Sequence, residues 1–173
     1  MTKLSLYLAT MLLGTNFSAS TLPTDTTPAI EYVEYVSTTS VEQKLVDLTN
    51  AERWDNDLRP LSVNPMLVEV AREHSREMSA KGYFDHISPT PGLRTPMNRY
   101  ISYLGHTPTW AYLGENLFYC TVVDADRGHD CLMNSKKHKD NILNDRFEEI
   151  GVGVYEAPDG QFYVTQLFLA QID

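Results

Sequence analysis

The sequence predicts one domain of the α+β class. Three helical patterns occupy residues 40–105, and alternating valines and aromatic residues follow near the end of the chain. Because helices come first and strands last, without a regular alternation of the two, a doubly wound parallel sheet is disfavoured. The chain has 173 residues, which is enough for one domain with a sizeable core.

The first twenty residues predict a secretory signal peptide, residues 1–20. Lys3 precedes an apolar run over residues 4–14, and small residues at positions 18–20 end the segment, as in a cleavable signal. The run is too short to span a bilayer. We therefore expect a secreted protein, extracellular or periplasmic, with no transmembrane segment in the mature chain.

The expected mature chain is acidic. Removing Lys3 leaves 13 basic residues against 23 acidic ones, a net charge of −10. A protein that binds nucleic acids or anionic membrane surfaces needs a basic surface, so neither is an expected partner. We expect the mature protein to be a monomer.

A tether and a first helix are expected next. Residues 21–39 are rich in Thr and Pro, which is typical of a spacer. Ser40 and Gln43 form a capping box, so a helix should run from there to about Trp54. Its apolar residues recur at helical spacing at Val41, Leu45, Leu48 and Ala51.

The second and third helices have clear start and stop signals. Asn64-Pro65 combines an N-cap with proline at the first helical position, and Gly82 ends the pattern. Its inward stripe consists of Leu67, Val70, Ala71, His74 and Met78. A histidine on such a stripe is usually a satisfied core residue, so His74 is expected to be one. A third helix is expected from Thr95-Pro96 to Gly105.

The last third of the chain predicts shorter elements. Residues 124–133 fit a helix, and Ser135 has the position of an N-cap for a further turn that carries His138. Residues 150–155 and 161–169 alternate around a Pro-Asp-Gly turn, which predicts a β-hairpin. His106 and His129 are expected in polar loops, without a role.

Cys120 and Cys131 predict a disulfide. They enclose ten residues, and in an oxidising compartment such a pair is more often bridged than reactive. The loop-entropy estimate gives such a bridge about 2–3 kcal/mol of stabilisation.

Three polar side chains predict a metal-capable site: His86 in FDHISP, Glu115 in LGEN and His138 in SKKHKDN. Two imidazoles and a carboxylate are the ligands of many open zinc sites, so zinc or another divalent cation is the expected cofactor. Taken alone, His86 could equally close its loop through a backbone hydrogen bond. Catalysis by Ser135 with His138 is disfavoured, because no nucleophile-elbow glycines accompany them.

The segments FDHISP, LGEN, MNSKKHKDNIL, IGVGVY and YVTQLF, taken in order, resemble the CAP domain family. This family of SCP-like domains is named for cysteine-rich secretory proteins, antigen 5 and pathogenesis-related 1 proteins, and the match is to its secreted prokaryotic-type branch. The resemblance assigns residues 40–173 to one such domain. It implies a three-layer α-β-α sandwich with a central, mostly antiparallel sheet, and a large cleft with a His/Glu cluster.

The resemblance also implies site residues. His86 and Glu115 match the first histidine and first glutamate of the cluster, and His138 matches the Ser-x-x-His typical of the prokaryotic-type branch. Ser135 and Gln166 are expected to line the ligand cleft. A second glutamate and a second histidine of eukaryotic members are replaced in this chain. Loss of an anionic ligand implies weaker and more pH-sensitive metal binding.

The function implied by this resemblance is binding of a ligand or partner, with lipid among the candidates. The alternative is a zinc-assisted hydrolase, a peptidase or esterase, in which a metal-bound water attacks the substrate. An HExxH motif would supply its general base, and this motif is absent. Glu115 is expected to be either a buried partner of the two histidines or a metal ligand, and the second is favoured because two neutral imidazoles do not by themselves justify a carboxylate beside them. As a metal ligand, Glu115 should tolerate replacement by Gln in the apo protein almost without loss of stability.

Overall fold

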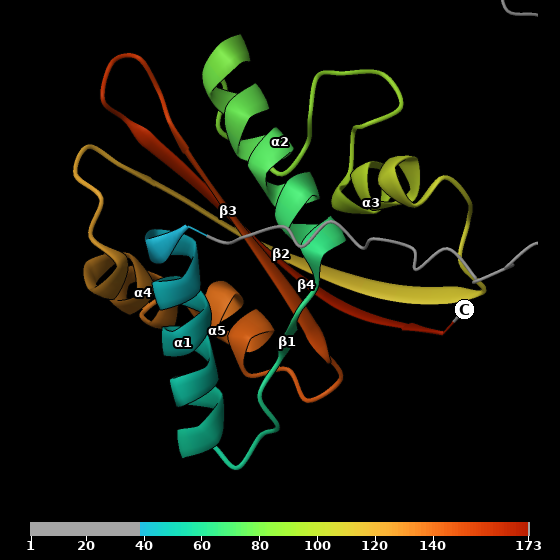
Figure 1. Ribbon diagram of the computed structural model, residues 1–173, viewed down its shortest axis with the longest axis vertical. Helices are drawn as coiled ribbons and strands as arrows, with labels where there is room; N and C mark the ends of the chain where they lie inside the picture. The colour runs from blue at the N-terminus through green and yellow to red at the C-terminus, as the bar shows by residue number, and fades with distance from the viewer. Residues whose placement is uncertain (1–38, 173) are drawn as a thin grey trace, which may run out of the picture. The chain divides into compact units, whose positions relative to one another are not determined.

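The computed structural model describes residues 39–172, and the predicted signal peptide and nearly all of the predicted tether lie outside this range. The helices are α1 (Ser40–Asp55), α2 (Pro65–Lys81), α3 (Pro96–Leu104), α4 (Ala125–Met133) and α5 (Lys136–Ile142) (Figure 1). The strands are β1 (Ser62–Val63), β2 (Trp110–Cys120), β3 (Glu149–Glu156) and β4 (Phe162–Ile172). No helix in the described range is long and apolar enough to cross a membrane.

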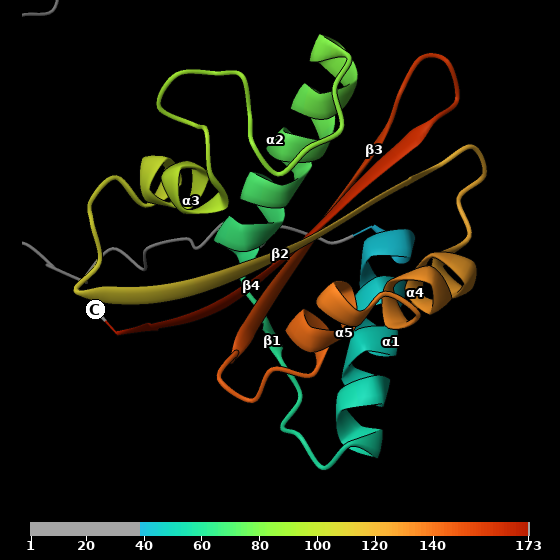
Figure 2. The same ribbon diagram turned by 180° about the vertical axis from the view of Figure 1, so that it is seen from behind.

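The four strands form one sheet in the order β1-β3-β4-β2. The short β1 runs parallel to β3, and the other two pairings are antiparallel. Helices α2 and α3 cover one face of the sheet, and α1, α4 and α5 cover the other (Figures 1 and 2). The predicted α+β sandwich with a mostly antiparallel sheet is therefore confirmed.

The alternation of β4 explains why the sheet has a core on each face. Val164 and Phe168 belong to the apolar cluster shared with α1, α4 and α5, whereas Leu167 and Leu169 belong to the cluster shared with α2 and α3. Successive side chains of a strand point to opposite faces, so one strand supplies both cores.

Two glycines of β3 bring α2 unusually close to the sheet. A Cβ at Gly153 would lie 2.1 Å from the backbone nitrogen of Arg72, and one at Gly151 would lie 2.3 Å from the carbonyl carbon of Leu67. Neither distance is possible for a real side chain, so this contact requires glycine. The helix itself has the predicted limits, with Asn64 as N-cap and Gly82 as C-cap.

The first helix differs from its prediction. Its capping box is formed by Thr39 and Glu42, one residue before the expected pair. Its buried face is partly polar and consists of Glu42, Leu45, Val46, Thr49 and Arg53, while Ala51 is exposed. Arg53 lies on this face because its guanidinium donates to carbonyl groups beyond α1, including those of Ile142 and Asn144.

Strand β2 is absent from the sequence prediction, although it is paired with β4 along its whole length. The polar Gly114-Glu115-Asn116 in its centre interrupts the alternation that marks a half-buried strand. Long-range pairing with β4, rather than local sequence, therefore determines this strand. The other predicted helices and the hairpin are present.

The predicted disulfide is not formed. Cys120 ends β2 and Cys131 lies in α4, and both are free thiols, the first partly buried and the second exposed. A bridge requires Cα atoms within about 7 Å and suitably directed side chains, which a spacing of ten residues does not guarantee. Burial raises the pKa of the Cys120 thiol.

Candidate functional site

Glu115 is the centre of the polar site. It lies in the middle of β2, and its side chain is 2% exposed. Its Oε1 accepts a hydrogen bond from Nδ1 of His86 at 2.7 Å, and its Oε2 accepts one from Nη2 of Arg99 at 2.5 Å. Both carboxylate oxygens are thus engaged. We call these three residues the Glu115 cluster.

Arg99 is the member of the Glu115 cluster that the sequence prediction missed. This residue of α3 is buried, and its Nη1 also lies near the carbonyl oxygens of His86, Leu93 and Arg94, at 3.2–3.4 Å. One side chain therefore ties the loop between α2 and α3 to the carboxylate of β2. The sequence provided only a general indication that Glu115 has such a partner, because a buried carboxylate is costly unless a cation pairs with it.

His86 is the accessible member of the Glu115 cluster. The loop that carries it begins at Gly82, which ends α2 in the left-handed region with φ of 65°. Half of the His86 side chain is exposed. The hydrogen bond with Glu115 raises the pKa of His86, against a smaller opposite effect of burial. The predicted pair of His86 and Glu115 is therefore brought together, with the imidazole on the outside.

His74 is a satisfied core residue, as expected. Its ring is buried on α2, and its Nε2 lies 3.2 Å from the carbonyl oxygen of Asp85. The same nitrogen lies 4.0 Å from Glu115 Oε1. Burial is the main cause that lowers the pKa of His74. A neutral imidazole in this place stabilises the loop without adding a second cation beside Arg99.

The backbone of His138 contacts the face of β2 opposite to the Glu115 side chain. Asn116, whose side chain points away from that of Glu115, donates a hydrogen bond to the backbone carbonyl of His138 at 3.2 Å and accepts one from Asn141. Helix α5 therefore packs on the face opposite the Glu115 cluster. Burial, and then the charge of His86, lower the pKa of His138, so the two imidazoles lie within electrostatic reach.

The two predicted cleft residues have different environments. Ser135 is the N-cap residue of α5, but its side chain makes no capping hydrogen bond. Gln166 is fully buried on the α1 side of the sheet, where its amide lies 3.4 Å from the hydroxyl of Thr49 and accepts a bond from Asn116. In this arrangement Gln166 supports the sheet and does not reach the surface.

The predicted zinc ligands do not form a three-ligand set. Within residues 39–172, no three His, Cys, Asp or Glu side chains are grouped closely enough to hold a metal ion. The carboxylate of Glu115 already binds Arg99 and His86, and the contact of His138 with β2 is made by its backbone carbonyl. A zinc site at these residues therefore stays a prediction.

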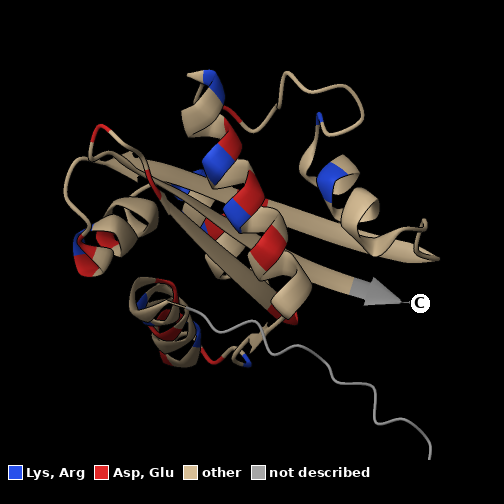
Figure 3. Cartoon of the chain, turned by 45° about the horizontal axis from the view of Figure 1, so that its top comes forward, with Lys and Arg blue, Asp and Glu red and all other residues tan. Residues whose placement is uncertain are grey.

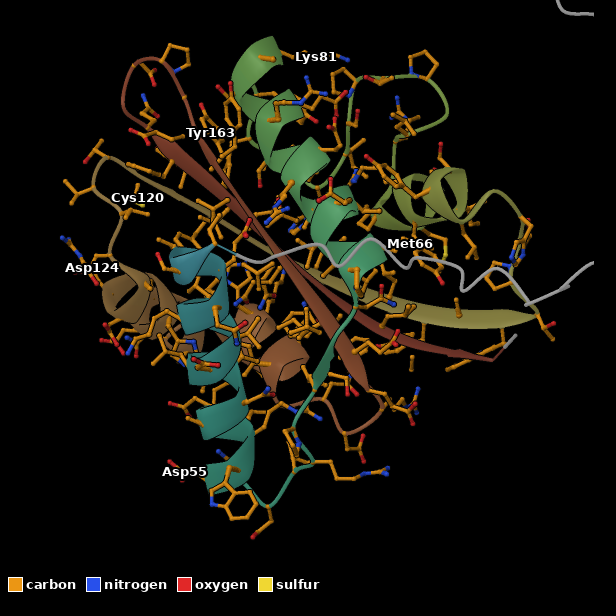
Figure 4. All side chains as sticks on the ribbon, in the orientation of Figure 1. Asp55, Met66, Lys81, Cys120, Asp124 and Tyr163 are labelled. Atoms are coloured by element: carbon orange, nitrogen blue, oxygen red, sulfur yellow. The ribbon has the colours of Figure 1, made fainter. Side chains whose placement is uncertain are left out.

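Two exposed aromatic side chains lie close in sequence to the Glu115 cluster, Phe84 before His86 and Tyr119 after Glu115 on β2. Phe84, two residues before His86, contacts Tyr119 edge to face with ring centroids 5.0 Å apart. Tyr119 also stacks on Tyr163 at 6.3 Å. Tyr119, Cys120 and Cys131 help to line a pocket of about 540 Å³, near the end of the sheet where Figure 4 labels Cys120 and Tyr163. We call Phe84, Tyr119 and Tyr163 the aromatic wall.

Comparisons with known proteins agree with this architecture. The family model described as "CAP: Cysteine-rich secretory protein family" matches residues 46–168. The uncharacterized protein YkwD of Bacillus subtilis (strain 168) is 37% identical over 135 residues, which is 78% of this chain and 49% of YkwD. The chain thus spans about half the length of this relative.

Two solved structures are also similar. An extracellular protein containing a SCP domain from Bacillus anthracis is 32% identical, with a TM-score of 0.65 over 76% of this chain and 40% of that protein. An outer surface protein from Borrelia burgdorferi has a TM-score of 0.68 over 79% of this chain and 97% of its own, at 20% identity. The second likeness shows the fold alone.

Proposed function

The chain belongs to the CAP family, the cysteine-rich secretory protein family, and we propose that it is a secreted binding module rather than a hydrolase. The observation that carries this proposal is the engagement of both oxygens of Glu115. Secretion rests on the signal-peptide pattern of residues 1–20, and the similar Bacillus anthracis protein is described as extracellular.

Turnover would require a free general base beside the bound substrate. Glu115 is the buried carboxylate of the cluster, and both of its oxygens are already occupied by hydrogen bonds from Arg99 and His86. His86 is held by the same carboxylate, but no serine or cysteine nucleophile is hydrogen-bonded to it in the described range. The Glu115 cluster is therefore better suited to fix the loop between α2 and α3 against β2 than to transfer protons.

The expected ligand has an apolar part. Phe84 and Tyr119 are 43% and 55% exposed, and they contact each other and Tyr163. Phe84 lies on the same loop as the half-exposed imidazole of His86. Aromatic groups with a polar tip suit ligands that are apolar at one end and polar at the other. A single-chain lipid, with its polar end near His86, has this chemistry.

Binding of lysophosphatidylcholine below its micellar concentration tests this proposal. Tyr119→Ser should weaken binding roughly tenfold, which corresponds to a loss of about 1.4 kcal/mol of apolar contact. Trp54→Ser removes an aromatic residue of α1 that is 75% exposed and should change nothing. Equal binding by both variants, or hydrolysis of the lipid by the wild type, would overturn the proposal.

Divalent metal binding is the second candidate. One observation favours it: a carboxylate holds Nδ1 of His86, as outer partners commonly hold metal-binding histidines. Calorimetric titration with zinc at pH 7.5 and 6.0 is the test, because protons compete for imidazole. Binding should weaken at the lower pH and in His138→Ala, but not in His106→Ala. No heat of binding at pH 7.5 removes this candidate.

A further inference from the structure

A pocket of about 300 Å³ lies between α2 and α3, apart from the aromatic wall. Its apolar lining consists of Val70, Ala80, Leu93 and Tyr103. Pockets for small molecules begin at about this size, and they combine an apolar lining with a few placed polar groups. This pocket therefore has the general form of a ligand site.

The charged groups at this pocket neutralise one another. Arg76 pairs with Glu73, and Lys81 pairs with Glu77, in keeping with the mixture of basic and acidic residues along α2 in Figure 3. A charged ligand would meet neighbours of both signs while losing its own hydration. The pocket thus favours an uncharged ligand.

Arg99 lines the pocket and has one unused hydrogen-bond donor. Its side chain is 4% exposed. Its Nη atoms donate to Glu115 and to backbone carbonyls, whereas its Nε has no hydrogen-bond partner within residues 39–172. A buried donor without an acceptor is unfavourable, and a ligand oxygen at this point would remove that cost.

We propose that this pocket binds an uncharged, mainly apolar organic molecule whose single acceptor oxygen, such as a ketone or amide oxygen, bonds to Nε of Arg99. The apolar body lies against Val70, Ala80 and Leu93. The site is distinct from the aromatic wall, and lipid or zinc binding near His86 is not required for it. Failure of either proposal leaves the other standing.

Acetophenone is a suitable probe because it joins an apolar ring to one ketone oxygen. Amide and Arg side-chain NMR signals should shift at millimolar acetophenone for residues of the pocket, including the Nε–H of Arg99. Ethylbenzene, which lacks the oxygen, should bind about tenfold more weakly, as expected for loss of a hydrogen bond to a charged donor. Benzoate, which adds a charge, should also bind more weakly than acetophenone.

Two matched variants separate pocket filling from general damage. Ala80 and Ala51 are both exposed helical alanines, and only Ala80 lines the pocket. Ala80→Trp should abolish the shifts caused by acetophenone, and Ala51→Trp should leave them unchanged. The proposal is overturned if no shifts occur, if they lie outside the pocket, if ethylbenzene or benzoate binds as well as acetophenone, or if Ala80→Trp retains binding.

Discussion

Replacing Glu115 by Gln removes one charge from a buried pair and leaves the shape almost unchanged. The side chains of Glu115 and Arg99 are 2% and 4% exposed. Removing one partner of such a pair costs about 3–5 kcal/mol, because the other charge stays buried without compensation. The amide oxygen of Gln keeps one acceptor, which recovers about 1 kcal/mol. We therefore expect a loss of roughly 3 kcal/mol in the free energy of unfolding.

Urea unfolding followed by far-UV circular dichroism, with zinc absent, measures this loss. For a domain of this size, about 3 kcal/mol corresponds to a fall in melting temperature of roughly 10 °C. Glu73→Gln is the matched control, because Glu73 and Arg76 form an exposed pair with 43% and 59% of their side chains accessible. Such surface pairs contribute at most about 1 kcal/mol.

A double-mutant cycle with Arg99→Met isolates the pair itself. If Glu115 and Arg99 stabilise each other, the double variant should be about 2 kcal/mol more stable than the sum of the single losses predicts. Arg99→Met alone should also loosen the loop that it bonds. The reasoning is refuted if Glu115→Gln is as mild as Glu73→Gln, which is the result expected of a metal ligand without a cationic partner.

Two further predictions concern protonation and packing. The pKa of His86 is raised by its hydrogen bond with Glu115, so the stabilisation from this pair is fully present below about pH 6.5 and is lost as the pH rises through the raised pKa. Imidazole NMR titration should show His86 titrating at a higher pH than His138. Glu115→Gln should lower the pKa of His86. An unchanged His86 titration in that variant would contradict its hydrogen bond. Gly153→Ala should lower the free energy of unfolding, measured by heat or urea, by at least about 3 kcal/mol, because the added Cβ would lie 2.1 Å from the backbone of α2. A loss below about 1 kcal/mol would show that α2 moves away from the sheet easily.

Local signals in the sequence were sufficient for most of the fold. The limits of α2 follow from Asn64-Pro65 and Gly82, and all five residues of its predicted inward stripe are buried. The terminal hairpin follows from its alternation and turn. In each case short-range capping, turn chemistry and periodicity agree with the final packing.

Long-range contacts explain what the sequence did not predict. Strand β2 exists because it pairs with β4. His129, expected in a polar loop, lies in α4 and is 3% exposed, since packing of α4 on α1 covers it. Similarly, Glu42 was not expected inside: burial alone would raise its pKa, but hydrogen bonds from Arg72, Thr39 and Val154 outweigh this effect and lower it.

The candidate site was predicted in part. Local motifs identified His86 and Glu115, which the structure brings together at 2.7 Å. The sequence could not indicate that Glu115 and Asn116 point to opposite faces of an unpredicted strand, with the backbone carbonyl of His138 bonded to Asn116. Nor could it assign Arg99 as the partner, because that pairing depends on how α3 packs on β2.

Native mass spectrometry of the purified mature protein, with metal analysis and organic extraction of the same sample, tests the central claim most directly. A binding module with an engaged Glu115 should carry an extractable organic molecule and well below one zinc ion per chain, and Tyr119→Ser should carry less of that molecule. One zinc ion per chain, lost in Glu115→Gln and accompanied by no organic molecule, would contradict the account.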